Sequence, residues 1–174
     1  MKKILVILAI FSIGVTGIFS GCLHEGMGRL VLKITDEPGD LNITEALVTM
    51  SQVRVHYAGI TENDTIGEWI TIINESQTFD LIALQNATEL FGSANLSAGW
   101  YTQIRLYVEK ALVTIDGVQY DLEISPKHVK LIKPWKIIDN LILILTLDFD
   151  VQKSIHKTGN GEYIMEPTIK IIQE

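Results

Sequence analysis

Aspartates with spacing suited to chemistry lie in two short segments of the sequence. Asp148 and Asp150 are two residues apart in an apolar segment, and residues two apart on a strand place their side chains on the same face. Asp36 and Asp40 flank Pro38-Gly39, a dipeptide typical of a tight turn. Calcium takes about six to eight oxygen ligands from carboxylates and loop carbonyls. If the fold brings the two segments together, these four aspartates predict a calcium site, and the sequence predicts no other cofactor.

Two alternatives to calcium remain open for the same aspartates. In the first, Asp36 and Asp40 cap turns, while Asp148 and Asp150 accept hydrogen bonds from neighbouring backbone amides. In the second, a carboxylate pair hydrolyses a glycosidic bond, which requires the two groups to lie about 5 to 9.5 Å apart across a cleft. Because nothing in the sequence indicates a cleft, we assign no catalytic residue.

Other motifs with chemical potential are weaker. A zinc site needs three or four converging ligands, and the histidines are scattered without close pairs. They are His24, His56, His128 and His156. The S-x-x-K motif at 154–157 and the K-T-G motif at 157–159 share Lys157, whereas in penicillin-interacting serine enzymes the two motifs lie on separate elements. We therefore interpret 154–159 as a turn before the last strand.

The elements that must position these residues are strands. Alternating segments rich in β-branched and aromatic residues predict them at 29–34, 46–56, 68–73, 100–108, 111–115, 118–124, 128–132, 141–150 and 162–172. Asp116-Gly117 between two such segments predicts a tight hairpin. The segment 141–150 is apolar on both faces near its start, which predicts a central strand covered on both sides there. Only 79–90 predicts a helix, from the spacing of Leu81, Leu84 and Leu90.

These elements predict an all-β fold with one domain. About nine strands with one or two short helices are typical of a β-sandwich of immunoglobulin-like or prealbumin-like kind, over residues 28–174. Trp100 and Tyr101 are adjacent in a strand, so at most one of them faces the core. We expect most aromatic side chains to fill the sandwich; an exposed tryptophan would be a candidate for contacting a sugar or a protein.

The first 22 residues indicate export. A basic start at Lys2 and Lys3, an apolar segment of 16 residues at 4–19 and the small pair Ser20-Gly21 are typical of a secretory signal. Small residues directly before Cys22 resemble the lipobox of secreted lipoproteins, although Phe19 stands where an aliphatic residue is usual. We expect a signal peptide at 1–21, a lipid on Cys22 and a short tether at 22–27. An uncleaved anchor helix is the alternative, and both place the domain outside the cell at a membrane.

Asparagine usage gives a second indication of location. Five of the seven asparagines begin an N-x-S/T triplet, whereas serine and threonine together number 22, so chance alone predicts roughly one. The triplets begin at Asn42, Asn63, Asn74, Asn86 and Asn95. They predict N-glycosylation of exposed turns, with the ordinary co-occurrence of Asn and Thr in turns as the alternative. A lipobox and abundant glycosylation triplets in one chain favour an archaeal source.

The charge balance excludes one class of partner. Without Lys2 and Lys3, 12 basic residues oppose 21 acidic ones, which gives a net charge near −9. Such a surface repels nucleic acid, and no basic run contradicts this.

Several blocks together resemble a known family. They are GRLVLKITDEPGD, ITEALVTMSQVRVH, FDLIAL, LSAGWYTQIRLYV and LDFDVQKSI, and their succession over about residues 28–172 is similar to the domain-of-unknown-function family numbered 4382, which is found in surface lipoproteins of archaea and bacteria. The resemblance implies an extracellular β-sandwich and no accepted activity. We therefore predict a lipid-anchored module that binds or presents without catalysis, with cell-envelope carbohydrate or protein as its partner. A surface carbohydrate hydrolase is the alternative.

Overall fold

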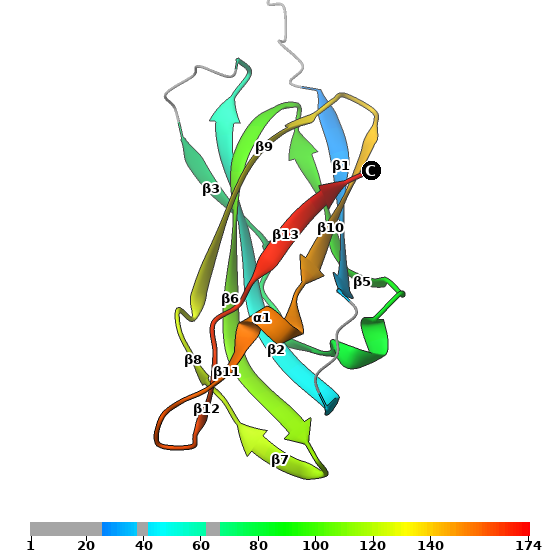
Figure 1. Cartoon of the computed structure of the whole chain (residues 1–174). Coiled ribbons are helices and arrows are strands. Elements are labelled where there is room, and N and C mark those ends of the chain that lie inside the picture. Colours follow the sequence, from blue (N-terminus) through cyan, green and yellow to red (C-terminus); the bar gives the residue numbers. More distant parts are fainter. Residues whose placement is uncertain (1–25, 38–41, 62–66) are drawn as a thin grey trace, which may run out of the picture.

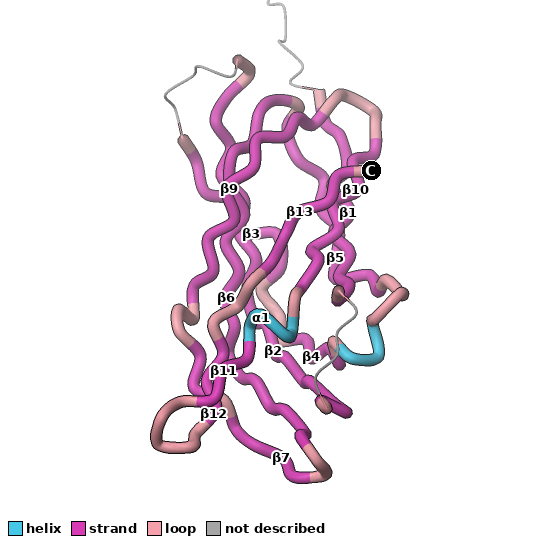
Figure 2. Tube along the Cα trace, viewed as in Figure 1, coloured by secondary structure: helices cyan, strands magenta, loops and turns pink. Residues whose placement is uncertain are grey.

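Strands form most of the described chain, which comprises residues 26–37, 42–61 and 67–174 of a computed structural model (Figures 1 and 2). Thirteen strands lie in these residues: β1 (Met27–Asp36), β2 (Ile43–Gly59), β3 (Glu68–Ile73), β4 (Gln77–Asp80), β5 (Glu89–Ser97), β6 (Gly99–Ile115), β7 (Val118–Asp121), β8 (Glu123–Ile124), β9 (His128–Ile137), β10 (Ile142–Phe149), β11 (Ile155–Lys157), β12 (Tyr163–Met165) and β13 (Ile169–Gln173). Two short helical segments, η1 (Ile82–Leu84) and α1 (Val151–Ser154), complete the set.

The first sheet has the order β13-β10-β1-β5. Its two central strands, β1 and β10, are parallel, with Leu32 opposite Leu145 and Ile34 opposite Leu147. The outer strands β5 and β13 are antiparallel to their neighbours. Apolar residues alternate along β1 because one face of this strand meets the core, where Leu32 and Ile34 are fully buried.

The second sheet is built on two strands of 17 residues each, β2 and β6, which pair along their whole length. β3 and β4 pair with successive parts of the free edge of β2, while β9 and β7 pair with successive parts of the free edge of β6. Two long strands therefore run through most of the length of the molecule, and shorter strands divide each edge (Figure 1).

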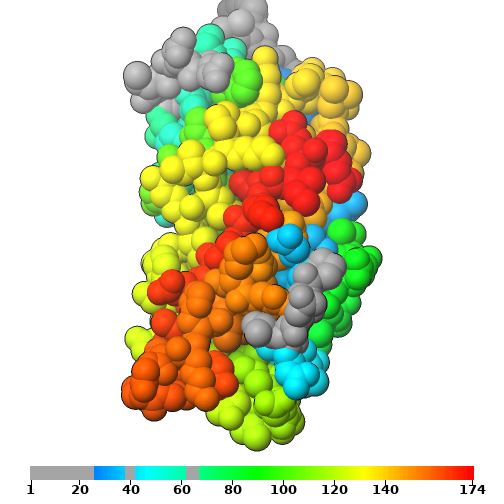
Figure 3. All heavy atoms as spheres, viewed as in Figure 1, coloured from blue at the N-terminus to red at the C-terminus, as the bar shows by residue number. Residues whose placement is uncertain are grey.

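The core lies between the two sheets. Buried side chains of β1 and β10 form one hydrophobic cluster with those of β2, β6 and β9. Within it, Tyr101 of β6 stacks on Trp135 of β9 with ring centroids 4.4 Å apart. On the face seen in Figure 3, atoms of β13 lie directly against those of β9, where Lys133 Nζ donates a hydrogen bond of 2.7 Å to the Ile171 carbonyl. This contact joins the two sheets along one side.

A small third sheet, β11-β12-β8, follows α1. It packs at the same end of the molecule as the β6–β7 hairpin (Figure 1). In that hairpin Asp116 and Gly117 have φ values of 50° and 78°, between Ile115 and Val118, which pair with each other. Positive φ at both turn residues is the conformation that an Asp-Gly hairpin favours, so this prediction is confirmed.

The predicted all-β sandwich is confirmed, and the number of strands is corrected. Two predicted strands, 100–108 and 111–115, are one continuous strand, β6. Of the two residues between them, Glu109 is a bulge, because Thr49 pairs with Lys110 and the next residue, Met50, pairs with Val108. Conversely, the predicted strands 118–124 and 162–172 are each divided in two.

The predicted helix at 79–90 is wrong. Phe79 is buried in β4 opposite Val48, and only Ile82–Leu84 forms a helical turn. Asp80 Oδ1 accepts hydrogen bonds from the amides of Ala46 and Ile82, which ties the end of β4 to β2. The apolar spacing that suggests a helix arises because the chain passes from a strand into a single turn over the same core.

The predicted burial of 141–150 is partly wrong. β10 is a central strand, as expected, but its start is open, with Ile142 65% exposed. Burial on both faces occurs further along, where Leu145, Thr146 and Leu147 are all buried. The prediction that one of Trp100 and Tyr101 at most faces the core is confirmed, since Tyr101 is fully buried and Trp100 is half-buried.

Candidate functional site

The two aspartate segments meet at the end of β1 and β10. Parallel pairing places Thr35 opposite Asp148 and Asp36 opposite Phe149. Asp36 Oδ1 then accepts a hydrogen bond of 3.0 Å from the amide of Val151, the first residue of α1. The fold therefore brings Asp36 close to Asp148 and Asp150, as the calcium hypothesis requires.

Asp36 is buried and forms no ion pair with any described residue. It is 2% exposed, and its second oxygen accepts a hydrogen bond of 3.2 Å from Gln85 Nε2. Burial raises the pKa of Asp36 to about 6, because the hydrogen bonds from Val151 and Gln85 offset only part of the desolvation, and the nearby charges of Asp150 and Asp148 add to the rise. Its carboxylate links the end of β1 to the start of α1.

Asp150 caps α1. Its side chain accepts hydrogen bonds from the Lys153 amide at 3.0 Å and from Lys153 Nζ at 2.5 Å. Burial acts to raise the pKa of Asp150, but these hydrogen bonds outweigh it and the pKa is lowered. Asp148 is half-buried and has a raised pKa through burial, against which Lys170 acts. Asp150 is thus kept charged by the amide and the exposed side chain of Lys153.

These contacts match the backbone-capping alternative for Asp36 and Asp150. The amides come from α1 itself, whereas in that alternative Asp36 caps the turn that follows it. Among the described residues no group of three His, Cys, Asp or Glu side chains is arranged to hold a metal ion. Asp40 lies outside the described residues, so calcium binding by the four aspartates stays a prediction. A glycosidase pair must face a substrate, and hydrolysis by these carboxylates stays an alternative.

The S-x-x-K serine is also structural. Ser154 is fully buried; its hydroxyl donates to the Asp150 carbonyl at 2.6 Å and accepts from the Thr168 amide at 2.9 Å. The motif spans the end of α1 and all of β11, so the predicted turn begins only at Thr158. A hydroxyl so engaged joins two backbone segments and has no free access to a substrate.

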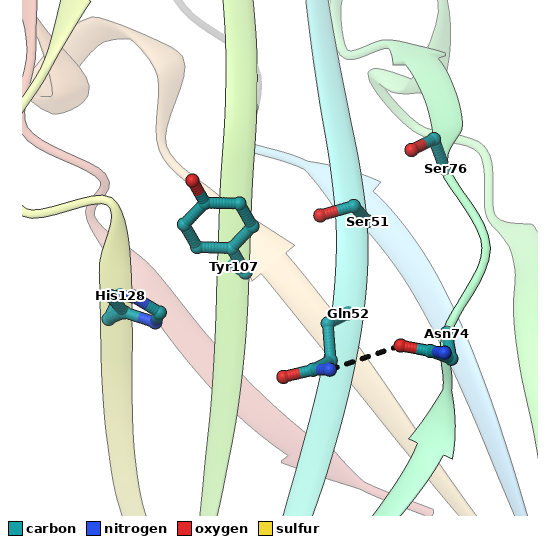
Figure 4. A pocket seen from close by; sticks show the side chains of 6 residues that line it. All are labelled: Ser51, Gln52, Asn74, Ser76, Tyr107 and His128. Atoms are coloured by element: carbon teal, nitrogen blue, oxygen red, sulfur yellow. Dashed lines mark hydrogen bonds between the residues drawn. The ribbon is translucent and has the colours of Figure 1, made fainter.

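A second arrangement lies on the outer face of the second sheet, which points away from the core. Figure 4 shows a polar cavity there, lined by Ser51, Gln52, Asn74, Ser76, Tyr107 and His128, with a volume of about 430 Å³. A neighbouring cavity of about 280 Å³ shares Gln52, Tyr107 and His128 and adds Arg54 and Arg105. We call the two together the outer groove. It crosses β2, β6 and β9.

Cross-strand pairing aligns the groove residues in rows. Arg54 of β2 lies opposite Arg105 of β6, which lies opposite Lys130 of β9. The next row contains Gln52, Tyr107 and His128, and the rings of Tyr107 and His128 are 4.7 Å apart. These side chains face outward because they alternate with the buried residues of the same strands.

Trp69 of β3 organises the two arginines. The guanidinium carbon of Arg105 lies 3.9 Å from the centre of the Trp69 ring, and that of Arg54 lies 5.6 Å from it. His56, whose ring is 4.9 Å from that of Trp69, has Nδ1 at 2.8 Å from the Thr102 hydroxyl. The indole therefore supports both cations by cation–π contact and is itself held by His56.

The four described glycosylation asparagines are all exposed. Asn42 donates a hydrogen bond to Asp116 at 2.8 Å, and Asn74 accepts one from Gln52 at 3.1 Å at the edge of the polar cavity. Asn86 follows η1 with φ of 63°, and Asn95 lies in β5. Exposure meets the first requirement for glycosylation. Asn63 lies outside the described residues, as do Cys22 and His24.

The sequence analysis considered His56 and His128 as zinc ligands and exposed tryptophans in general, and it missed Arg54 and Arg105. A usable signal is present, because Arg54 and His56 are two apart in one alternating segment, and Arg105 and Tyr107 are two apart in another. Each pair must therefore share a polar face. What the sequence does not contain is the register that places one pair beside the other.

The chain belongs to the family described as "Domain of unknown function (DUF4382)", which matches residues 27–167. No curated protein and no solved structure matches it. Across 26–37, 42–61 and 67–174, no helix combines the length and apolar character needed to cross a membrane. The family and the fold define an all-β domain whose activity has to be inferred from its surface.

Proposed function

We propose that this protein is a membrane-anchored, extracytoplasmic binding module without catalytic activity. The observation that carries the proposal is the outer groove. It presents two arginines, an aromatic support and a polar cavity on the open face of a sheet. The buried Asp36, Asp150 and Ser154, by contrast, are engaged by partners within the fold. The buried side chains that could take part in catalysis thus stabilise the fold, whereas the exposed side chains of the outer groove are able to bind a ligand.

The short tether limits how far the domain can lie from an anchor at Cys22. Cys22 precedes Gly26 by four residues, and an extended chain of that length reaches at most roughly 14 Å. The end of the sandwich at which the chain emerges would therefore lie close to the bilayer, whether the anchor is a lipid or an uncleaved helix.

The composition of that end of the sandwich is consistent with a membrane nearby. Exposed apolar side chains gather there, and Met27 and Asn140 are joined by a backbone hydrogen bond that closes the group. Its members are Met27, Ile60, Ile138, Leu141 and Ile142. Apolar surface of this kind is unfavourable in water and is compatible with a lipid headgroup region.

Two measurements test the anchoring and binding parts of the proposal. The intact mass of the protein extracted from membranes should show the loss of residues 1–21 and the addition of an alkyl group, and Cys22→Ser should abolish that addition. Retention of Met1 in the membrane-extracted protein would contradict the lipid anchor and indicate the anchor helix. In parallel, the purified protein should bind isolated cell envelope and sediment with it; absence of binding would contradict a binding function.

A further inference from the structure

We propose that the outer groove binds an acidic saccharide, with the arginine pair holding an anionic group of the sugar and the polar cavity holding its hydroxyl groups. This inference rests on the proposed binding function and names the ligand class for the same site. It is carried by three features of the groove: unbalanced positive charge, preorganised donors and adjoining polar space.

Positive charge in the groove has no internal counterpart. Arg54 lies directly opposite Arg105, and like charges in a cross-strand pair repel each other. Within the described part of the chain, neither arginine forms an ion pair, and neither does Lys130 in the same row. In a chain of net charge −7, three aligned and unpaired cations are a local exception. An anion between the two guanidinium groups would remove the repulsion.

The arginines are held in a way that leaves their donors free. The guanidinium carbon of Arg105 lies 3.9 Å from the centre of the Trp69 ring, and a cation–π contact of this kind leaves N–H groups of the guanidinium able to bind a carboxylate or sulfate. Arg54 Nε and Gln103 Oε1 are buried and have no hydrogen-bond partner within the described residues. Buried polar atoms are normally paired, so an unpaired donor and an unpaired acceptor on neighbouring strands indicate hydrogen-bonding capacity that a ligand entering the groove would use.

Gln103 lies next to the arginine row. His56 pairs with Gln103, two residues along from the Arg54–Arg105 pair, so the open amide oxygen is a diagonal neighbour of Arg54 on the same face. An acidic sugar carries an anionic oxygen that can accept from the guanidinium groups and a hydroxyl that can donate to Gln103 Oε1. A simple inorganic anion such as chloride could interact with the guanidinium groups but has no hydroxyl to donate.

The adjoining cavity fits the neutral part of a saccharide. Its lining of hydroxyl, amide and imidazole groups can both donate and accept, and its volume of about 430 Å³ lies in the range of small-molecule sites. The shared residues Gln52, Tyr107 and His128 make it continuous with the arginine cavity. Because the rest of the surface is acidic, attraction of a polyanion by charge alone is disfavoured, and binding should also require the sugar hydroxyl groups that the polar cavity can hold.

The proposal is tested by measuring how tightly the protein binds defined polymers. The full chain is used, purified from its own membranes in nonionic detergent. Polygalacturonate supplies sugar carboxylates, dextran sulfate supplies sugar sulfates, dextran is the neutral polymer and duplex DNA is the polyanion without sugar acids. We expect binding to one or both acidic saccharides, weakened by salt, and much weaker binding to dextran and DNA. Which acidic polymer binds more tightly identifies the anionic group.

Variants assign the binding to the groove. Arg105→Gln should weaken binding at least roughly tenfold, as expected for loss of a charged hydrogen-bonding group. Arg105→Lys keeps the charge but not the two-pronged geometry, so it should restore binding only in part. Lys157→Gln is the matched control: it removes one charge from an exposed lysine in β11, outside the groove, and should bind like the parent. Arg105 is exposed, and unchanged melting of its variants shows that they fold.

Three outcomes overturn the inference. One is equal affinity for DNA and acidic saccharide, which would indicate charge attraction without recognition. Another is acidic saccharide binding that Arg105→Gln leaves intact. The third is a parent that binds isolated envelope yet neither acidic polymer, and here the proposed binding function survives while the ligand class does not. A parent that binds neither envelope nor polymer contradicts both proposals.

Discussion

Replacing Asp36 with Asn should stabilise the protein above neutral pH and leave it almost unchanged at pH 4. Asn keeps an oxygen that can accept from the Val151 amide, and the Gln85 amide can rotate to accept from the new NH₂ group. What the change removes is a buried negative charge beside Asp150 and Asp148.

The expected gain in stability at high pH follows from the direction of the pKa shift of Asp36. The folded pKa of Asp36 is about 6, above the ordinary value of 3.8, so between these values the folded state holds a proton that the unfolded state has lost. Stability from this group is therefore fully present below about pH 4 and is lost as pH rises through 6. A difference of about 2 pKa units corresponds to at most about 3 kcal/mol at pH 8, and we expect roughly 2 kcal/mol after relaxation around the charge.

Thermal unfolding of the full chain in nonionic detergent, followed by circular dichroism between pH 4 and 8, measures this difference. For a domain of this size, 2 kcal/mol corresponds to a rise in melting temperature of roughly 4–8 °C for Asp36→Asn at pH 8. Asp121→Asn is the control, since it removes the same charge from an exposed side chain of β7 and should change little at either pH. A variant that melts below the parent at pH 8, or a gain of the same size at pH 4, would refute the assignment of a destabilising buried charge.

The remaining predictions concern the cap of α1 and the glycosylation triplets. Asp150→Ala should lower the free energy of unfolding by roughly 1–3 kcal/mol because the Lys153 amide loses its acceptor, whereas Asp150→Asn should lose less. Melting with and without added calcium completes that test: a rise in the parent that is absent from the double variant Asp148→Asn, Asp150→Asn would assign a cation site. Peptide mapping before and after deglycosylation should find sugar on the predicted asparagines, all of which lie between Asn42 and Asn95. If all five sites are unmodified, the excess of triplets reflects only the ordinary co-occurrence of Asn with Ser or Thr in turns.

The predicted fold was recoverable from the sequence where local signals decide it. β3 has its predicted bounds of 68–73, and the Asp116-Gly117 hairpin forms as expected, because alternation and turn chemistry act over a few residues. The prediction of a helix at 79–90 was wrong because the deciding interaction is not local. Phe79 pairs in a strand with Val48, which lies 31 residues earlier in the sequence. This long-range pairing overrides the helical spacing.

The candidate site was recoverable only in part. The aspartate segments could be identified because carboxylates next to a turn and an apolar strand are unusual, and the parallel pairing of β1 with β10 does bring them together. The outer groove could not be identified from the sequence, because it depends on the register of three strands. A shift of one residue between β2 and β6 would place Arg54 opposite a buried position and separate it from Arg105.

Parallel pairing of β1 with β10 also constrains the order in which the chain can complete its fold during synthesis. The hydrogen bond from Val151 to Asp36 closes a loop of 115 residues, and β1 has no partner on that edge until β10 has emerged. β5 can cover the opposite edge earlier, since it ends at Ser97. For most of translation the first strand therefore presents an unpaired apolar edge, the kind of surface that nucleates aggregation. Chains that stop before Ile142 should remain in that state, so the last fifth of the sequence decides whether the first strand is safely buried.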